Sequence, residues 1–272
     1  MSVQFRNLVI AGLAAVGFAA AAGSAVANPY LPVSNLTFST YSGSNPKGLF
    51  SAVNPAGWVR GTVANNIDLV FIDAPGTATG FSSPNYPVYG PFADPPSGGN
   101  FIQADGNPDY ESVFGQLLTG LVVGTQYDLS FYQAAGQQQS FSGATTEQWR
   151  VFFGTDLPSA ITLSGPTAGV YSVNVPAGTV EQDSPIMNTP TMGVTPWNQV
   201  TLTFTATTTT EYLTFLAWGN GGSNANQPPT VFLAGVNGAT APEPATLSIM
   251  GVALAGLGGL VSRRRAKRNA AV

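Results

Sequence analysis

The chain has 272 residues, of which 8% are charged, against about a quarter in ordinary soluble domains. It contains neither cysteine nor histidine, which excludes disulfides, thiol nucleophiles, Ser-His-Asp triads and the usual transition-metal ligands. Its 32 glycines and 21 prolines indicate many turns, while an aromatic content of 11% is enough to build a core. We therefore expect a folded protein that is not an enzyme.

The first 27 residues have the pattern of a secretory signal peptide. Arg6 precedes an apolar run over 8–22, and the small residues Ala25 and Ala27 mark a cleavage site before Asn28. The alternative is an N-terminal membrane helix that is not removed. We expect signal peptidase as a partner and export of the residues that follow.

Residues 28–240 are predicted to form one all-β outer domain, a jelly roll or similar β-sandwich. Apolar and polar residues alternate in short segments that Gly, Pro and Asn turns separate. We expect 212–218 to be the antiparallel partner of 200–206. The expected strands are 35–40, 67–72, 100–104, 112–118, 127–131, 149–153, 200–206, 212–218 and 230–236.

Two proline-rich stretches, 74–99 and 164–196, are predicted to be loops, because prolines at this spacing exclude central strands. Loops of this length are either functional or mobile. The cations of 28–240 are Lys47, Arg60 and Arg150, against twelve acids, which gives a net charge of −9. Such a domain repels nucleic acid and anionic lipid, so we expect neither as a partner.

One acidic segment is a candidate calcium site, because Asp105, Asn107, Asp109 and Glu111 alternate oxygen-bearing side chains. The alternative is an ordinary acidic turn, since Asp-Gly and Asn-Pro are common turn formers. Apart from this ion we expect no cofactor.

Sugar binding needs flat aromatic faces together with planar amides or carboxylates. The loop residues Tyr86, Tyr89 and Trp197 are candidate ligand-binding residues, with amides available at 137–139, whereas Trp149 and Trp218 lie in alternating strands and are expected in the core. A glycoside hydrolase using two carboxylates is a further alternative. Its candidate acids are Asp68, Asp73, Asp94, Asp105, Asp109, Glu111 and Glu147.

The C-terminal segment 241–268 has three parts, which are followed by a short tail, 269–272. The triplet Pro242, Glu243 and Pro244 is held extended by its prolines. Residues 245–262 are uncharged and would form a transmembrane helix of about 27 Å. A basic cluster then places the tail in the cytoplasm and the rest outside; it includes Arg263, Arg264 and Arg265.

This arrangement resembles the sorting signal of PEP-CTERM proteins. The resemblance implies that exosortase, an integral-membrane transpeptidase, cuts the segment and that the outer portion travels to the surface of Gram-negative bacteria that make extracellular polysaccharide. The protein would be anchored in the inner membrane before processing and would then lie at the cell surface or outside the cell. In that process this chain is a substrate.

A second resemblance concerns the outer domain. Segments 98–106, 114–121 and 124–135 are similar to the outer domain of a subset of PEP-CTERM proteins, and the likeness extends loosely through Trp58, Trp149 and 207–217. It implies a β-jelly roll resembling galactose-binding-like and carbohydrate-binding modules. Many such modules hold a structural calcium with acids near the first and in the last strand, but 35–39 and 232–236 carry no carboxylate here.

The sequence therefore predicts an exported, non-catalytic surface or matrix protein that exosortase sorts, with a structural role on or in extracellular polysaccharide. One alternative is a carbohydrate-binding module with a specific glycan ligand. A second is the carboxylate-based glycosidase.

Overall fold

The computed structural model describes residues 27–42, 48–49, 55–62, 69–80, 86–110, 112–223, 225 and 227–237. These residues form an all-β structure with two short 3-10 helices, η1 (Pro158–Ala160) and η2 (Asn220–Gly222). The strands are β1 (Gly48–Leu49), β2 (Trp58–Thr62), β3 (Val70–Asp73), β4 (Phe101–Asp105), β5 (Ser112–Thr119), β6 (Gln126–Gln137), β7 (Thr145–Gly154), β8 (Thr162–Thr167), β9 (Val170–Asn174), β10 (Val180–Asp183), β11 (Met187–Thr189), β12 (Asn198–Thr205), β13 (Thr210–Gly219) and β14 (Pro229–Ala234).

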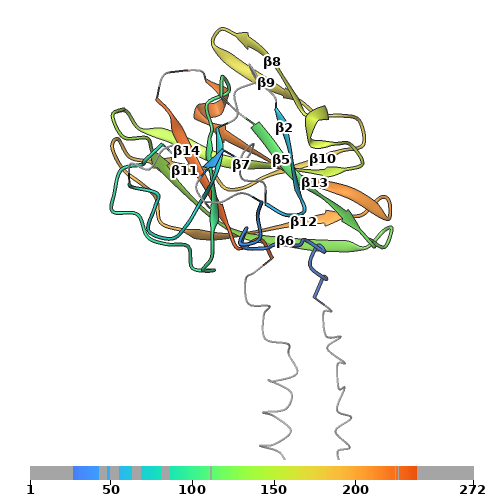
Figure 1. The fold of residues 1–272 in the computed structure, drawn as a ribbon. Coiled ribbons are helices and arrows are strands. Elements are labelled where there is room, and N and C mark those ends of the chain that lie inside the picture. The colour runs from blue at the N-terminus through green and yellow to red at the C-terminus, as the bar shows by residue number, and fades with distance from the viewer. Residues whose placement is uncertain are drawn as a thin grey trace, which may run out of the picture.

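Two sheets pack face to face as a β-sandwich, which confirms the predicted class. Sheet 1 has the strand order β1-β3-β4-β14-β6-β12, and sheet 2 has the order β10-β7-β13-β5-β2, with β11 also paired to β7. Within both sheets the strand pairs are antiparallel. The hairpin of β8 and β9 forms a separate small sheet and projects from the sandwich (Figure 1).

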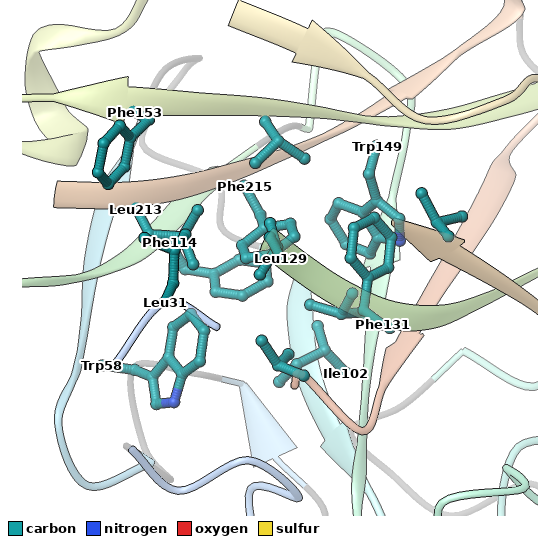
Figure 2. Close-up of a cluster of buried hydrophobic side chains, with 14 of the residues drawn as sticks. Leu31, Trp58, Ile102, Phe114, Leu129, Phe131, Trp149, Phe153, Leu213 and Phe215 are labelled. Atoms are coloured by element: carbon teal, nitrogen blue, oxygen red, sulfur yellow. The ribbon is translucent and has the colours of Figure 1, made fainter. Parts of the chain in front are cut away.

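The main core lies between the sheets, because alternate residues of each strand face inward. On β7 the inward positions include Trp149, which is fully buried, and its ring meets the rings of Phe114 and Phe215 edge-on at 5.8 and 5.9 Å. Figure 2 shows these three residues together with Phe131. The indole Nε1 of Trp149 donates a hydrogen bond of 3.0 Å to the carbonyl oxygen of Phe232 on β14. Trp149 therefore joins sheet 2 to sheet 1.

The outer face of each sheet carries its own smaller apolar cluster. On sheet 1 the cluster includes Phe101 and Phe232, and the proline-rich stretch covers it through Val88 and Phe92. On sheet 2 the cluster includes Trp218, and the β8–β9 hairpin covers it through Tyr171 and Val173. The stretch 74–99, predicted as a loop, thus serves as a cover. The prediction of a loop over 164–196 is wrong, because this stretch contains the strands β9, β10 and β11. As expected from their prolines, the strands within 164–196 lie at sheet edges or in the hairpin, not at a sheet centre.

Most expected strands are confirmed within a few residues, but two further predictions are wrong. Segment 35–40 is not a strand, because Asn35 and Phe38 adopt positive φ angles of 51° and form turns. The strands at 200–206 and 212–218 are not partners, since β12 pairs with β6 in sheet 1 and β13 pairs with β5 and β7 in sheet 2. The link between them crosses from one sheet to the other, and a carboxylate oxygen of buried Glu211 accepts a hydrogen bond from the backbone N–H of Thr207 there.

The first and last described segments lie side by side against β6. Asn237 accepts a hydrogen bond from the N–H of Ser130 and donates one of 2.6 Å to the carbonyl of Leu31. Asn28 donates to Asp128, also on β6. The predicted cleavage residue Ala25, the triplet 242–244 and the arginines 263–265 lie outside the described residues.

Among the described residues, no helix has the length and apolar character needed to cross a membrane.

Glu147 is a buried ionisable group on the inward face of sheet 2. Glu147 lies on β7 two residues before Trp149 on the same inward face, is 1% exposed, and accepts a hydrogen bond of 2.7 Å from the hydroxyl of Thr189. Burial raises the pKa of this carboxyl from 4.5 to about 7, although the hydroxyls of Thr145 and Thr189 oppose the shift. The folded protein therefore binds this proton more readily than the unfolded chain does.

This shift predicts how stability depends on pH. The stabilising contribution of protonated Glu147 is complete below about pH 4.5 and is lost as the pH rises to about 7. Glu147→Gln keeps a hydrogen-bonding group without the charge, so its stability relative to wild type should increase by about 3 kcal/mol between pH 4 and pH 8. Urea unfolding across this range measures the difference.

A matched control is Glu181→Gln, because Glu181 lies at the surface and pairs with Arg150. It should not reproduce the gain at high pH. Parallel stability profiles for Glu147→Gln and wild type would contradict the assignment.

Candidate functional site

A cavity of about 180 Å³ lies where several strands of sheet 1 reach the same end. Three aromatic side chains line it, those of Tyr86, Tyr110 and Phe141, with Leu69 and Pro228 completing the apolar part. Two polar side chains, Asp105 and Gln138, also line it. These residues come from the beginning of β3, the end of β4, the residue before β14 and the residues after β6, so the fold assembles the cavity from distant parts of the chain.

The alternation of β4 explains why the cavity opens on the outer face of sheet 1. Ile102 and Ala104 point into the main core, whereas Phe101 belongs to the outer cluster and Asp105 shares its outward parity. Tyr86 belongs to the proline-rich cover over this face, and its ring packs edge-on against Phe71 at 5.8 Å. Gln103 of β4 donates a hydrogen bond of 2.6 Å to the carbonyl of Tyr86 and so fixes the edge of the cavity.

Asp105 supplies the negative charge of the cavity. Its Oδ1 accepts a hydrogen bond of 2.8 Å from the backbone N–H of Asn107. Burial raises the pKa of the carboxyl from 3.8 to about 7, and the hydrogen bond from Asn107 works in the opposite direction. Near neutral pH this carboxyl can therefore accept hydrogen bonds when ionised or donate one when protonated.

A chain of hydrogen bonds runs from Asp105 to the β8–β9 hairpin. The Oδ1 of Asn107 accepts from the N–H of Asp109 at 3.0 Å, and the carboxylate of Asp109 accepts from the hydroxyl of Tyr171 at 2.7 Å. The bond to Asp109 is the main reason that the pKa of Tyr171 is raised. The hairpin thus holds the loop that carries Tyr110.

The candidate calcium residues Asp105, Asn107 and Asp109 make hydrogen bonds that stabilise this turn. Asp105 and Asn107 accept backbone hydrogen bonds two residues on, as Asx turns do, and Asp109 accepts from Tyr171. Glu111 lies outside the described residues. Within the described part of the chain, no three acidic, histidine or cysteine side chains gather as a metal site would require. These contacts favour the interpretation as an ordinary acidic turn. They do not support calcium binding, which stays a prediction.

The three candidate aromatic residues are not brought together. Tyr86 lines the cavity, and the hydroxyl of Tyr89 donates to the carbonyl of Phe141, which supports the cavity from its other side. Trp197 lies in the outer cluster of sheet 1, where its ring packs against Phe92 at 5.6 Å and its Nε1 donates to the carbonyl of Ala93. The sequence did not single out Tyr110 or Phe141, although aromatic residues beside turn formers are a usable signal.

A second hollow of about 130 Å³ lies on sheet 2, lined in part by Gln148, Ile186 and Trp218. The guanidinium of Arg150 lies 4.9 Å from the centre of the Trp218 ring and pairs with Glu181. The aromatic face in this hollow therefore already has a cationic partner. As expected, Trp149 is in the main core, and Trp218 packs in the outer cluster of sheet 2.

The acids named for a glycosidase occupy separate environments. Glu147 is buried on the inward face of β7 and is among the residues that line the hollow on sheet 2. Asp105 opens on the outer face of sheet 1, and Asp94 accepts a hydrogen bond from the N–H of Gly76. Asp73 is fully buried at the end of β3. Asp68, like Glu111, lies outside the described residues. The glycosidase alternative stays a prediction.

Tyr171→Phe tests the link between the hairpin and the cavity loop. Loss of a hydrogen bond to a carboxylate should lower the free energy of unfolding by about 1–2 kcal/mol and increase hydrogen exchange at the amides of 107–110. Ser164→Ala, which removes a hydrogen bond to Asn174 within the hairpin, is the control and should leave those amides unchanged. Equal exchange in both variants would show that the link does not order the loop.

Comparison with known proteins identifies no family. No protein-family model matches the chain, and no curated protein matches it. Among solved structures, the chain is similar to the enzymatically active domain of tailspike protein 4 from bacteriophage CBA120, with 12% identity and a TM-score of 0.37 over 72% of this chain and 21% of that one. It is also similar to the carbohydrate-binding module TmCBM61, solved in complex with β-1,4-galactotriose, with 10% identity and a TM-score of 0.35 over 71% of this chain and 93% of that one.

Proposed function

We propose that this chain is an exported protein whose β-sandwich domain binds an extracellular glycan through the cavity at the end of sheet 1. The observation that carries the proposal is the set of side chains in that cavity. Aromatic rings can stack on the C–H faces of a sugar, while a carboxylate and an amide can bond its hydroxyls. The cavity contains both kinds of group, since Tyr86, Tyr110 and Phe141 accompany Asp105 and Gln138.

The positions of these groups suit a surface ligand. Tyr86 is 40% exposed and Tyr110 is 39% exposed, so both rings are accessible from solvent. Each is anchored nearby, Tyr86 through Phe71 and Gln103, and the Tyr110 loop through the bond of Asp109 to Tyr171. An aromatic residue that is already positioned loses little conformational entropy when a ligand binds.

Export and sorting form the second part of the proposal. The signal-peptide pattern and the three-part C-terminal segment support them, together with exosortase and signal peptidase as partners. The jelly-roll assignment of the outer domain belongs to the same resemblance. The side chain of Asn28, the residue expected after cleavage, bonds to Asp128 on β6, so the packed domain includes the proposed mature N-terminus.

Glycan binding can be tested with Tyr110→Ala and Tyr86→Ala in the full-length chain, purified in a polyoxyethylene detergent that carries no sugar. Loss of one stacking ring should weaken binding about tenfold on a glycan array. Tyr212→Ala is the matched control, because Tyr212 lies on β13 at the opposite end of the sandwich from the cavity. No binding by wild type, or equal binding by all variants, would contradict the proposal.

Processing can be tested by mass spectrometry of the intact mature protein from its native host. We expect an N-terminus at Asn28 and loss of the arginine-rich C-terminus. A mature chain that retains residues 263–268 would contradict sorting by exosortase, and one that retains residues 1–27 would contradict removal of the signal peptide.

A further inference from the structure

Among the described residues, the lining of the cavity carries one charged group and no cation. Of the described side chains that line it, Asp105 is the charged one. The described residues include two cations, Arg60 and Arg150, and both lie on strands of sheet 2. Arg150 already pairs with Glu181 and packs on Trp218. An anionic group on a ligand would therefore meet Asp105 without a described cation to balance it.

The hydrogen bonds of Asp105 indicate which kind of ligand group it can bind. Its Oδ1 accepts the N–H of Asn107 at 2.8 Å, and no hydrogen bond within the described residues uses its Oδ2. An ionised carboxylate only accepts hydrogen bonds, so it needs a ligand that donates. Sugar hydroxyls donate, whereas ionised carboxylate, sulfate and phosphate groups do not, and they are repelled by a like charge at close range.

The size of the cavity limits how much of a ligand it can enclose. Its volume of about 180 Å³ is below the roughly 300–1,000 Å³ of pockets that surround a drug-sized ligand. A cavity of this volume can enclose a ligand part about the size of a single sugar ring, while the remaining units of a chain would stay in solvent.

Resting on the proposed glycan binding, we propose that the cavity takes a single neutral sugar unit by accepting its hydroxyl hydrogen at Asp105, and that it rejects acidic sugars. The discrimination between neutral and acidic sugars comes from the carboxylate of Asp105. Gln138 lines the same cavity, so a cation introduced there can reverse the preference. The ligand class is thus neutral hexose-containing polysaccharide, as opposed to uronic, sulfated or phosphorylated polymers.

The test compares sugars that differ only in charge. Binding of neutral galacto- and gluco-oligosaccharides and of the corresponding uronic acid oligosaccharides to the full-length chain is measured by calorimetry in the same sugar-free detergent at pH 8.5, where Asp105 is ionised. We expect wild type to bind the neutral member of a pair at least about tenfold more tightly. Asp105→Asn should reduce this ratio to about threefold or less.

Two further variants keep the test decisive. Gln138→Lys places a cation in the cavity without touching Asp105 and should reverse the preference toward the uronic acid sugar. Asp156→Asn removes a carboxylate after the far end of β7, where it accepts from Thr179, and should leave the ratio unchanged. Thermal unfolding of each variant checks that the sandwich remains folded.

The outcomes separate the two proposals. Binding of neither class contradicts the proposed function itself. Equal binding of neutral and acidic sugars by wild type, or a neutral preference that survives in Asp105→Asn, overturns the inference about charge and leaves glycan binding in place. A Gln138→Lys variant that still prefers the neutral sugar overturns it as well.

Discussion

The contact on which the sandwich depends is the indole of Trp149, which belongs to sheet 2 but bonds to the backbone of sheet 1. Its ring packs edge-on against Phe114 and Phe215, and its N–H donates to the carbonyl of Phe232. A buried indole nitrogen that lacks a partner carries a desolvation cost. The bond therefore favours one relative position of the sheets, and the inward residues of β6, β13 and β14 pack around it.

Once the sheets are positioned, their outer faces must also be covered, because the central strands are apolar on both sides. On β14, Val231 and Leu233 join the main core while Phe232 and Ala234 join the outer cluster of sheet 1. The proline-rich cover supplies Ala78, Val88 and Phe92 to that cluster, and Tyr86 of the same stretch lines the cavity. The candidate cavity lies where the cover meets the end of the sheet, so its aromatic wall is a consequence of how the outer face is buried.

Features that depend on neighbouring residues in the chain could be predicted from the sequence, whereas features that depend on contacts between distant segments could not. The alternation in 212–218 identifies a strand because a period of two is a local property. It does not identify the partner of that strand, since both sheets bury an inward face and an alternating segment fits either of them. The pairing with 200–206 was therefore wrong. Tyr86 and Asp105 could be named as candidates from their residue types, but Tyr110 and Phe141 become relevant only when loops far apart in the sequence meet.

The sequence by itself determined the all-β class, the absence of thiol and imidazole chemistry and the acidic character of 28–240, because these depend on composition and local periodicity. It also carries the predicted export and sorting signals, which are linear patterns. Only the tertiary structure decided which strands share a sheet, that Trp197 bonds to the carbonyl of Ala93 while Tyr86 lines a cavity, and that Glu147 is buried. The reason is that burial and side-chain neighbours are set by contacts across the two sheets, and no short segment contains that information.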